Sequence, residues 1–274
     1  IPESVTVIGG GAFEGCSSLT SVQIESTDAW MHITFKNEFS NPLSQAKHLY
    51  LHNNLVTEIA IPDSVTEVSS YALYNARDIQ KISIPDSVTS IGKNAFYNCA
   101  SLRAVTVPDS VTSIDDGAFK GCTALEEITL PFVGKSADAT VDYETPFGWI
   151  FGHSTSSSSG GIHQVNGYHY YSIPSSIKKV VITSDDSLPR QAFENCASIE
   201  EIVLPDSLSV LGYRAFGFCD KLKKVTLPSS LTSIPASAFA FCSALTDIVI
   251  PESVTVIGGG AFEGCSSLTS VQIE

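Results

Sequence analysis

The sequence predicts a solenoid, in which similar coils stack side by side and contribute one parallel β-sheet of about ten strands. Two observations predict this fold class. A motif of about 23 residues recurs along the 274-residue chain, as in residues 84–106 (IPDSVTSIGKNAFYNCASLRAVT) and 107–129. When the repeat is numbered from Ile1, Ala at position 12, Phe at position 13 and Cys at position 16 return in almost every copy. A period of this length places each copy against its neighbours, so the repeat decides the fold.

The strand of each coil comes from positions 19, 22 and 24, which are apolar, as in Leu102, Val105 and Val107. This L-x-x-L-x-L spacing is that of a leucine-rich repeat, and its last part alternates as a half-buried strand does. Proline follows at once and ends the strand, because it has no N–H to donate to a sheet. Ten parallel strands are expected to end at residues 24, 61, 84, 107, 130, 182, 204, 227, 250 and 273.

The rest of each coil is predicted to close a core behind the sheet. Positions 5 and 8 (Val88, Ile91) point inward, and Asp and Ser after the proline cap turn amides. Positions 10–15 (93–98) predict a short helical turn on the other side of the coil, with Ala95 packed closely and the phenylalanine rings forming one stack. All seven cysteines share one slot of the repeat, which predicts a buried ladder of free thiols rather than disulfides or a metal site.

Two insertions interrupt the expected single domain 1–274, at about 26–60 and 132–172. In the first, Pro42 suits the start of a helix, and 48–51 with 56–61 predict a β-hairpin around an Asn turn. The second is rich in aromatic residues and predicts a hairpin from 149–151 to 168–171, interrupted by a Ser-rich loop. Its aromatic cluster has two readings: a satellite core that fixes the insertion, or an exposed platform for a sugar or protein.

Charge and hydropathy narrow the classes of partner. The formal net charge is −14 and no basic stripe is present, which argues against nucleic acid and against an anionic membrane surface. No apolar run approaches the ~20 residues of a membrane helix, so direct membrane insertion is not expected. The chain has no visible signal peptide and does not begin with Met, and we interpret it as a mature or excised fragment.

Motifs for catalysis or cofactors are incomplete. Residues 134–136 (GKS) end like a phosphate-binding loop, but Thr129 stands where its first Gly is needed. Residues 152–156 approach a nucleophile elbow, but Ser156 replaces the last Gly. All six histidines fall in the insertions, where the repeat imposes no residue type, and their spacing does not favour a metal site. We predict no enzyme activity, no catalytic residue, no metal and no cofactor.

Candidate binding residues lie at outward strand positions 21 and 23, because the concave face of a curved solenoid is its usual binding surface. Thr and Val at these positions are also simply good strand residues. The candidates there are Lys81, Thr106, Glu127, Thr129, Glu201, Lys224, Thr226 and Asp247. The aromatic candidates in the second insertion are Trp149, Phe151, Tyr168 and Tyr170.

The signature IPDSVTSIG…AF…C…L resembles the BspA-like (Treponema-type) leucine-rich repeat family. The insertions NPLSQAKHLYLHNNLVTEIAIP and LPFVG…PFGWIFG…IPSSIKKVVIT resemble segments of its bacterial members, so the resemblance covers essentially the whole chain. It implies a secreted or cell-surface bacterial protein that adheres to host proteins or other cells, without catalytic activity in the repeat. It fixes neither one ligand nor individual binding residues. The predicted function is therefore a non-enzymatic module that binds a protein or glycan; the alternative is a structural spacer or fibre unit.

The two ends of the sequence carry the same coil. Residues 1–25 return without a change at 250–274, whereas internal coils differ at many positions. One period of a longer tandem array would explain this, as would a deliberate duplication. Identical coils at both ends make head-to-tail self-association plausible, through a contact that does not close on itself.

Overall fold

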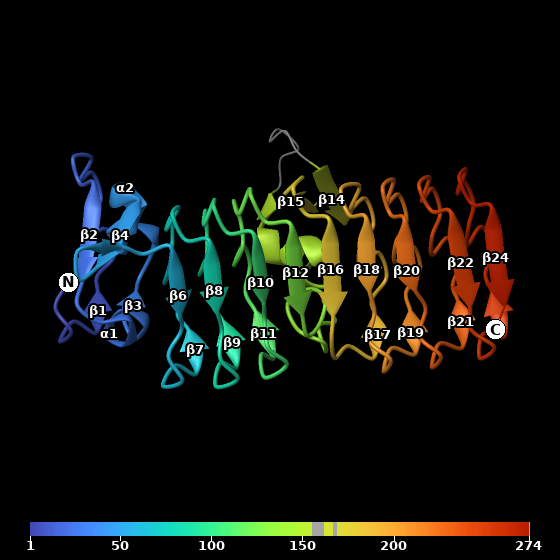
Figure 1. Cartoon of the computed structure of the whole chain (residues 1–274), viewed down its shortest axis with the longest axis horizontal. Helices are drawn as coiled ribbons and strands as arrows, with labels where there is room; N and C mark the ends of the chain where they lie inside the picture. Colours follow the sequence, from blue (N-terminus) through green and yellow to red (C-terminus); the bar gives the residue numbers. More distant parts are fainter. Residues whose placement is uncertain (155–161, 167–168, 274) are drawn as a thin grey trace. The chain divides into compact units, whose positions relative to one another are not determined.

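The computed structural model describes residues 1–154, 162–166 and 169–273. They fall into two compact units, 1–125 with 150–152, and 126–149 with 153–274. Repeated coils build both units (Figure 1). The prediction of a single domain stays a prediction. No helix in the described part of the chain is long and apolar enough to cross a membrane.

The first unit has parallel strands on one side of its coils and shorter strands on a second side. The parallel strands are β2 (Ser21–Ile24) with β4 (His48–Leu51), and β6 (Glu58–Ala60) with β8 (Lys81–Ser83) and β10 (Ala104–Thr106). The short pairs are β1 (Val7–Ile8) with β3 (Thr34–Phe35), and β7 (Glu67–Val68) with β9 (Ser90–Ile91) and β11 (Ser113–Ile114). Its helices are α1 (Thr27–Met31), η1 (Glu38–Ser40) and α2 (Leu43–Ala46).

The second unit repeats this plan and adds a small antiparallel sheet. Its parallel strands are β12 (Glu127–Leu130), β16 (Lys179–Ile182), β18 (Glu201–Val203) and β20 (Lys224–Thr226), and then β22 (Asp247–Ile250) with β24 (Ser270–Ile273). The short pairs are β17 (Ser187–Leu188) with β19 (Val210–Leu211), and β21 (Ser233–Ile234) with β23 (Val256–Ile257). The insertion contributes η2 (Asp142–Glu144), η3 (Phe147–Phe151), β13 (His153–Ser154), β14 (Ile162–Asn166) and β15 (His169–Ile173).

The predicted fold class, a leucine-rich repeat solenoid with parallel strands, is confirmed, and the strands end within one residue of the expected positions. The count of ten is wrong, because β4 is an eleventh such strand among the described residues. It pairs parallel to β2, with Val22 opposite Leu49. Sequence reasoning placed 48–51 only in a hairpin, because its spacing from β2 departs from 23 residues.

Each insertion contains a β-hairpin, but the strands differ from the predicted ones. In the first insertion β4 and β5 (Asn54–Leu55) do form a hairpin, and its turn residues His52 and Asn53 have φ of 50° and 64°. Its second strand is Asn54–Leu55 and not 56–61, which instead contains β6. The predicted helix beside Pro42 is confirmed as α2. In the second insertion the hairpin is β14 with β15; residues 149–151 belong to the helix η3, so their assignment as a strand was wrong.

A stack of phenylalanine rings forms the core of each unit. Phe96 and Phe119 lie 5.1 Å apart in the first unit. In the second, successive ring centroids lie 4.9–5.8 Å apart, through Phe147, Phe193, Phe216, Phe239 and Phe262. Phe13, in the first coil, is only half-buried.

Phe147 belongs to the second insertion, where sequence reasoning had placed no member of the stack. Its N–H donates to the carbonyl of Ala192, just as that of Phe193 donates to Ala215. The insertion therefore supplies its own position 13 and adds one ring to the stack of the second unit. The Nε2 of buried Gln164 donates to the carbonyl of Ala192, and its Oε1 accepts from the N–H of Gly148.

Positions 10–15 are consecutive turns rather than the predicted helical turn. The N–H of Tyr97 bonds to the carbonyl of Asn94, three residues back, and Asn94 and Asn98 have φ of 53° and 57°. Positions 11 and 15 have positive φ in the eight copies that have Ala at position 12, which are those of Ala12, Ala72, Ala95, Ala118, Ala192, Ala215, Ala238 and Ala261. Gly and Asn, which tolerate this conformation best, fill most of these slots. The turns also bond between coils, as from the N–H of Phe96 to the carbonyl of Ala118.

The buried thiol ladder is confirmed for Cys99, Cys122, Cys196, Cys219 and Cys242, each 0% exposed. The Sγ of Cys122 donates to the carbonyl of Phe96 in the preceding coil, at 3.3 Å. Burial raises the pKa of Cys122 to about 12. Cys16, in the first coil, is exposed, and Cys265, in the last, is partly exposed.

Serine at position 4 also joins coils, where we expected it to cap its own turn. The Oγ of Ser110 donates to the carbonyl of Val88 at 2.8 Å, and that of Ser253 to Leu231 at 2.7 Å.

Candidate binding surfaces

The outward face of the parallel strands in the second unit carries a ladder of paired charges. Neighbouring coils present charges of alternating sign at positions 20 and 21: Glu126-Glu127, Lys178-Lys179, Glu200-Glu201 and Lys223-Lys224. The strand register sets Glu127 opposite Lys179, Lys179 opposite Glu201, and Glu201 opposite Lys224.

These charges pair with one another. Lys179 Nζ lies 3.0 Å from Glu127 Oε1, Lys223 Nζ 2.7 Å from Glu200 Oε2, and Lys224 Nζ 3.5 Å from Glu201 Oε1. The hydrogen bond from Lys223 lowers the pKa of Glu200, and the bond to Glu127 raises the pKa of Lys179. The ladder thus joins coil to coil, and its charges are already compensated within the chain.

Three of the predicted strand residues, Glu127, Glu201 and Lys224, belong to this ladder. Sequence reasoning missed Lys179, although the Lys-Lys pair that lies between two Glu-Glu pairs is visible in the sequence. The threonines are not brought together: Thr129 and Thr226 lie in one row, separated by two valines. The remaining three are exposed: Lys81 on β8, Thr106 on β10, and Asp247 on β22, where it accepts a bond from the Thr246 hydroxyl.

The aromatic candidates of the second insertion are mostly packed inside. Trp149 and Phe151 are buried, Tyr170 is half-buried, and Tyr168 lies outside the described residues. The nearby ring of Tyr143 is 38% exposed and stacks on His169 at 4.9 Å. This burial favours the satellite-core reading of the cluster. In the described part of the chain no three His, Cys, Asp or Glu side chains are grouped to hold a metal ion.

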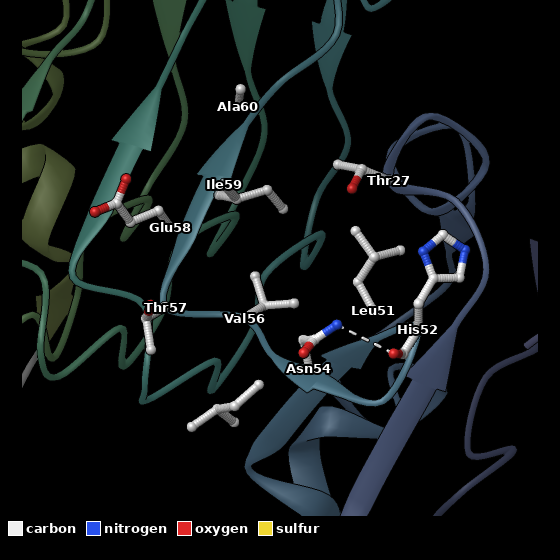
Figure 2. Close-up of a pocket in the computed structure, with 10 residues that line it drawn as sticks. Thr27, Leu51, His52, Asn54, Val56, Thr57, Glu58, Ile59 and Ala60 are labelled. Carbon is white, nitrogen blue, oxygen red and sulfur yellow. Dashed lines mark hydrogen bonds between the residues drawn. The ribbon is translucent and has the colours of Figure 1, made fainter.

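A groove opens where the parallel pairing of the first unit is interrupted. The chain turns back after β4 and forms β5, so β4 does not pair with β6. A pocket of about 530 Å³ lies between the β4–β5 hairpin and β6. Figure 2 shows that side chains from β4, the hairpin turn and β6 surround this space. The lining residues are Thr27, Leu51, His52, Asn54, Leu55, Val56, Thr57, Glu58, Ile59 and Ala60. The volume falls within the range of ligand pockets, ~300–1,000 Å³.

One wall of this groove is the backbone edge of β6, which is the edge strand of its sheet among the described residues. On the β8 side, the carbonyl of Thr57 accepts from Gln80 at 2.7 Å and the N–H of Ile61 donates to Ser83 at 3.0 Å. Backbone groups of successive strand residues point to opposite sides. The N–H and C=O groups of Glu58 and Ala60 therefore point away from β8, toward the groove that these residues line. Sequence reasoning missed this groove, because nothing in the repeat shows where pairing stops.

Comparison with known proteins identifies the repeat. A family model described as the BspA type leucine-rich repeat region matches residues 1–56, 44–139 and 163–274. The chain belongs to the BspA-type leucine-rich repeat family. Its membership confirms the resemblance noted in the sequence and makes the chain a leucine-rich repeat protein.

Among the solved structures similar to this BspA-type chain are three that are described as leucine-rich proteins. One from Bacteroides ovatus is 22% identical, with 99% of this chain and 77% of that chain covered and a TM-score of 0.45. One from T. pallidum is 24% identical, with 78% of each chain covered and a TM-score of 0.40. A leucine rich cell surface protein from Faecalibacterium prausnitzii is 26% identical, with 100% and 78% covered and a TM-score of 0.36. A search of curated proteins found no match.

Proposed function

We propose that this chain is a non-enzymatic binding module of a secreted or surface-exposed bacterial protein, and that its groove takes an extended protein segment. Membership of the BspA-type family supports the general role. The observation that carries the specific proposal is the backbone edge of β6, because an extended peptide adds to such an edge through main-chain hydrogen bonds.

The lining of the groove favours a peptide over a glycan. Apolar side chains of Leu51, Leu55 and Val56 offer contacts to side chains of an added strand. Apart from the imidazole of His52, no lining residue has an aromatic ring on which a sugar would stack. The charged ladder is less suited to a ligand, because its charges compensate one another.

The proposal is tested by screening the full chain against an array of host matrix proteins and glycans, and then measuring Kd for each hit. Leu55→Asp places a charge in the apolar wall, and Ala60→Pro removes an N–H that points into the groove but does not bond to β8. Both variants are expected to raise the Kd for a protein hit by about tenfold or more. Val210→Asp is the matched control, since Val210 is 54% exposed outside the groove and Leu55 42% exposed within it.

A protein hit that responds to both groove variants and not to the control would support the site. Protein hits whose Kd is unchanged in the groove variants would refute the proposed site. An array in which only glycans bind would refute it as well.

A further inference from the structure

Aromatic and arginine side chains contact one another on the turns of the second unit. They stand at positions 10, 11 and 15 of successive coils, and we call the cluster the turn patch. Tyr213 and Phe241 are each 40% exposed, and Phe218 is partly exposed. The turn patch consists of Arg190, Tyr213, Arg214, Phe218 and Phe241. None of these residues belongs to the charged ladder or to the groove.

Phe218 and Phe241 stand where the backbone favours a smaller residue. Their φ angles are 60° and 61°, in the left-handed region, where a bulky side chain is uncommon and raises the energy of the folded state. Phe239 of the core stack is fully buried, whereas Phe241 remains in contact with water, so its burial contributes less to stability. The other six matched copies show that the repeat does not require phenylalanine at this position, since they have Gly15, Asn75, Asn98, Gly121, Asn195 and Gly264.

The two arginines make the turn patch positive. The guanidinium of Arg214 lies over the rings of Tyr213 and Phe218, at 5.3 and 5.7 Å from their centroids. Its Nη1 lies 3.3 Å from Oε1 of the buried Glu194, which holds it in place. Arg190 lies 6.0 Å from the centroid of Tyr213, is exposed and makes no ion pair among the described residues. Two guanidiniums thus face one carboxylate, in a chain whose net charge is −14.

The rings of the turn patch offer edges rather than faces to a ligand. Phe218 and Phe241 stack with centroids 4.9 Å apart and an interplanar angle of 9°, so each covers a face of the other. A Cβ on Gly264 would lie 2.5 Å from Cδ1 of Phe241, so the next coil also reaches this ring. Sugars stack on ring faces, whereas ring edges are partly positive and attract negative groups. The turn patch therefore suits a carboxylate better than a neutral sugar.

We infer that the turn patch binds a protein partner that presents an Asp or Glu side chain beside an apolar one. The carboxylate accepts hydrogen bonds from Arg190 and Arg214, whose planar guanidiniums match its geometry. The apolar side chain lies against Phe218 and Phe241. Tyr, Phe and Arg without Lys is also the composition of the centre of a protein interface. This surface goes beyond the groove proposed above, lies in the other unit and does not depend on it.

A peptide selection tests this inference on the full chain. A displayed library of short random peptides is selected on the native chain, in the presence of an excess of soluble Arg190→Gln, Phe241→Asn double variant. The variant keeps the groove and removes peptides that bind outside the turn patch. We expect the remaining peptides to carry Asp or Glu beside an aromatic or aliphatic residue. Absence of any enriched peptide, or enrichment of peptides without a carboxylate, would overturn the inference.

Single variants then locate the binding site of a synthetic enriched peptide. Arg190→Gln and Phe241→Asn should each raise its Kd by about tenfold or more, as should replacing the acid of the peptide by its amide. Lys36→Gln is the matched control, because it removes one positive charge from an exposed side chain of the first unit and should leave the Kd unchanged. An equal rise of the Kd in Lys36→Gln would show that net charge, and not the turn patch, governs binding, and would overturn the inference.

Thermal melts separate binding from a role in folding. Phe241→Asn introduces the residue that Asn75, Asn98 and Asn195 provide at the same position, with φ of 64°, 57° and 63°. We expect its Tm to stay within about 3 °C of the native value while peptide binding is lost. A much larger decrease in Tm would assign the ring to the fold and overturn the inference. Sialyllactose serves as an anionic glycan probe: binding that the same variants abolish, without any selected peptide, would overturn the protein partner.

Discussion

The Nζ atom of Lys179 lies 3.0 Å from Oε1 of Glu127 on the neighbouring strand. Lys179 is at the same time the register partner of Glu201, so it stands between two carboxylates. The outward row of β12, β16, β18 and β20 therefore alternates in sign from coil to coil. Like charges directly opposite one another across strands destabilise a sheet, whereas opposite charges stabilise it.

Lys179→Glu should lower the Tm at low salt, because it lines up three carboxylates in one row. The deficit should shrink in high salt, since these side chains are partly exposed and screened. Lys179→Met removes the ion pair without adding repulsion, so its decrease in Tm should be smaller and should depend less on salt. Thermal melts at two ionic strengths check this; a salt-independent deficit for Lys179→Glu would show that charge is not its cause.

The repeated coil offers a matched pair of glycines. A Cβ on Gly258 would lie 2.4 Å from the backbone nitrogen of Ala236, whereas a Cβ on Gly9, the same residue of the identical coil, meets nothing within 4 Å. Gly258→Ala should cost about 1–3 kcal/mol in free energy of unfolding by overpacking, and Gly9→Ala close to nothing. Denaturant titration of both variants measures the difference; equal costs would show that Gly258 is not held by the preceding coil.

Phe119→Ala should lower the free energy of unfolding by about 3–5 kcal/mol, because it empties a fully buried slot of the ring stack. Phe13→Ala should cost less, since Phe13 is only half-buried and its removal empties a smaller buried volume. Denaturant melts compare the two directly. Equal losses would contradict the stacked-coil packing.

Thiol labelling should proceed in distinct phases in the native protein. Cys16 is exposed and should react quickly, and the partly exposed Cys265 more slowly. Cys99, Cys122 and Cys219 should stay protected, because they are buried and burial raises their pKa well above the ordinary range. Mass spectrometry after timed alkylation identifies each site; rapid modification of these three without denaturant would rule out the buried ladder.

Asp185 makes stability depend on pH. It occupies position 5, a slot of Val or Leu in most coils, and is 2% exposed, with Oδ2 accepting from the N–H of Val133 at 3.2 Å. Burial raises its pKa from 3.8 to about 6. The folded state therefore holds this proton more tightly than the unfolded state, and the stability it contributes is lost as the pH rises from about 4 to about 6.

The measurable effect is a difference between the native chain and Asp185→Asn. Relative to the variant, the native chain should lose about 1–3 kcal/mol of unfolding free energy between pH 4 and pH 7. Urea titrations at both pH values give this difference. If the difference in unfolding free energy between the native chain and Asp185→Asn were the same at both pH values, the Asp185 carboxyl would have an ordinary pKa.

The strict repeat made most of the fold predictable. Phe96 and Phe119 return at a fixed spacing, and a fixed spacing on stacked coils implies contact. The left-handed turns were missed although Gly or Asn at positions 11 and 15 signals them. β4 and Phe147 were missed for another reason: both complete the repeat from inside an insertion, where the spacing is lost.

The candidate groove could not be predicted, because it depends on a non-local choice. β4 could either pair with β6 or take up β5 beside it when the chain folds back, and both arrangements use the same alternating side chains. The turn at His52 and Asn53 selects the second arrangement. Only the positions of three strands together show that the edge of β6 is left open.

The alternating charges also constrain how a chain of this kind changes its length during evolution. Deleting the single coil that carries Lys178 and Lys179 would bring the Glu126-Glu127 pair against Glu200-Glu201. Duplicating that coil would set four lysines side by side. Losing or gaining two consecutive coils keeps opposite signs adjacent. Within this stretch, recombination between repeats is therefore tolerated best when it removes or adds two coils at a time. The charge pattern in this way keeps an even number of coils even and an odd number odd.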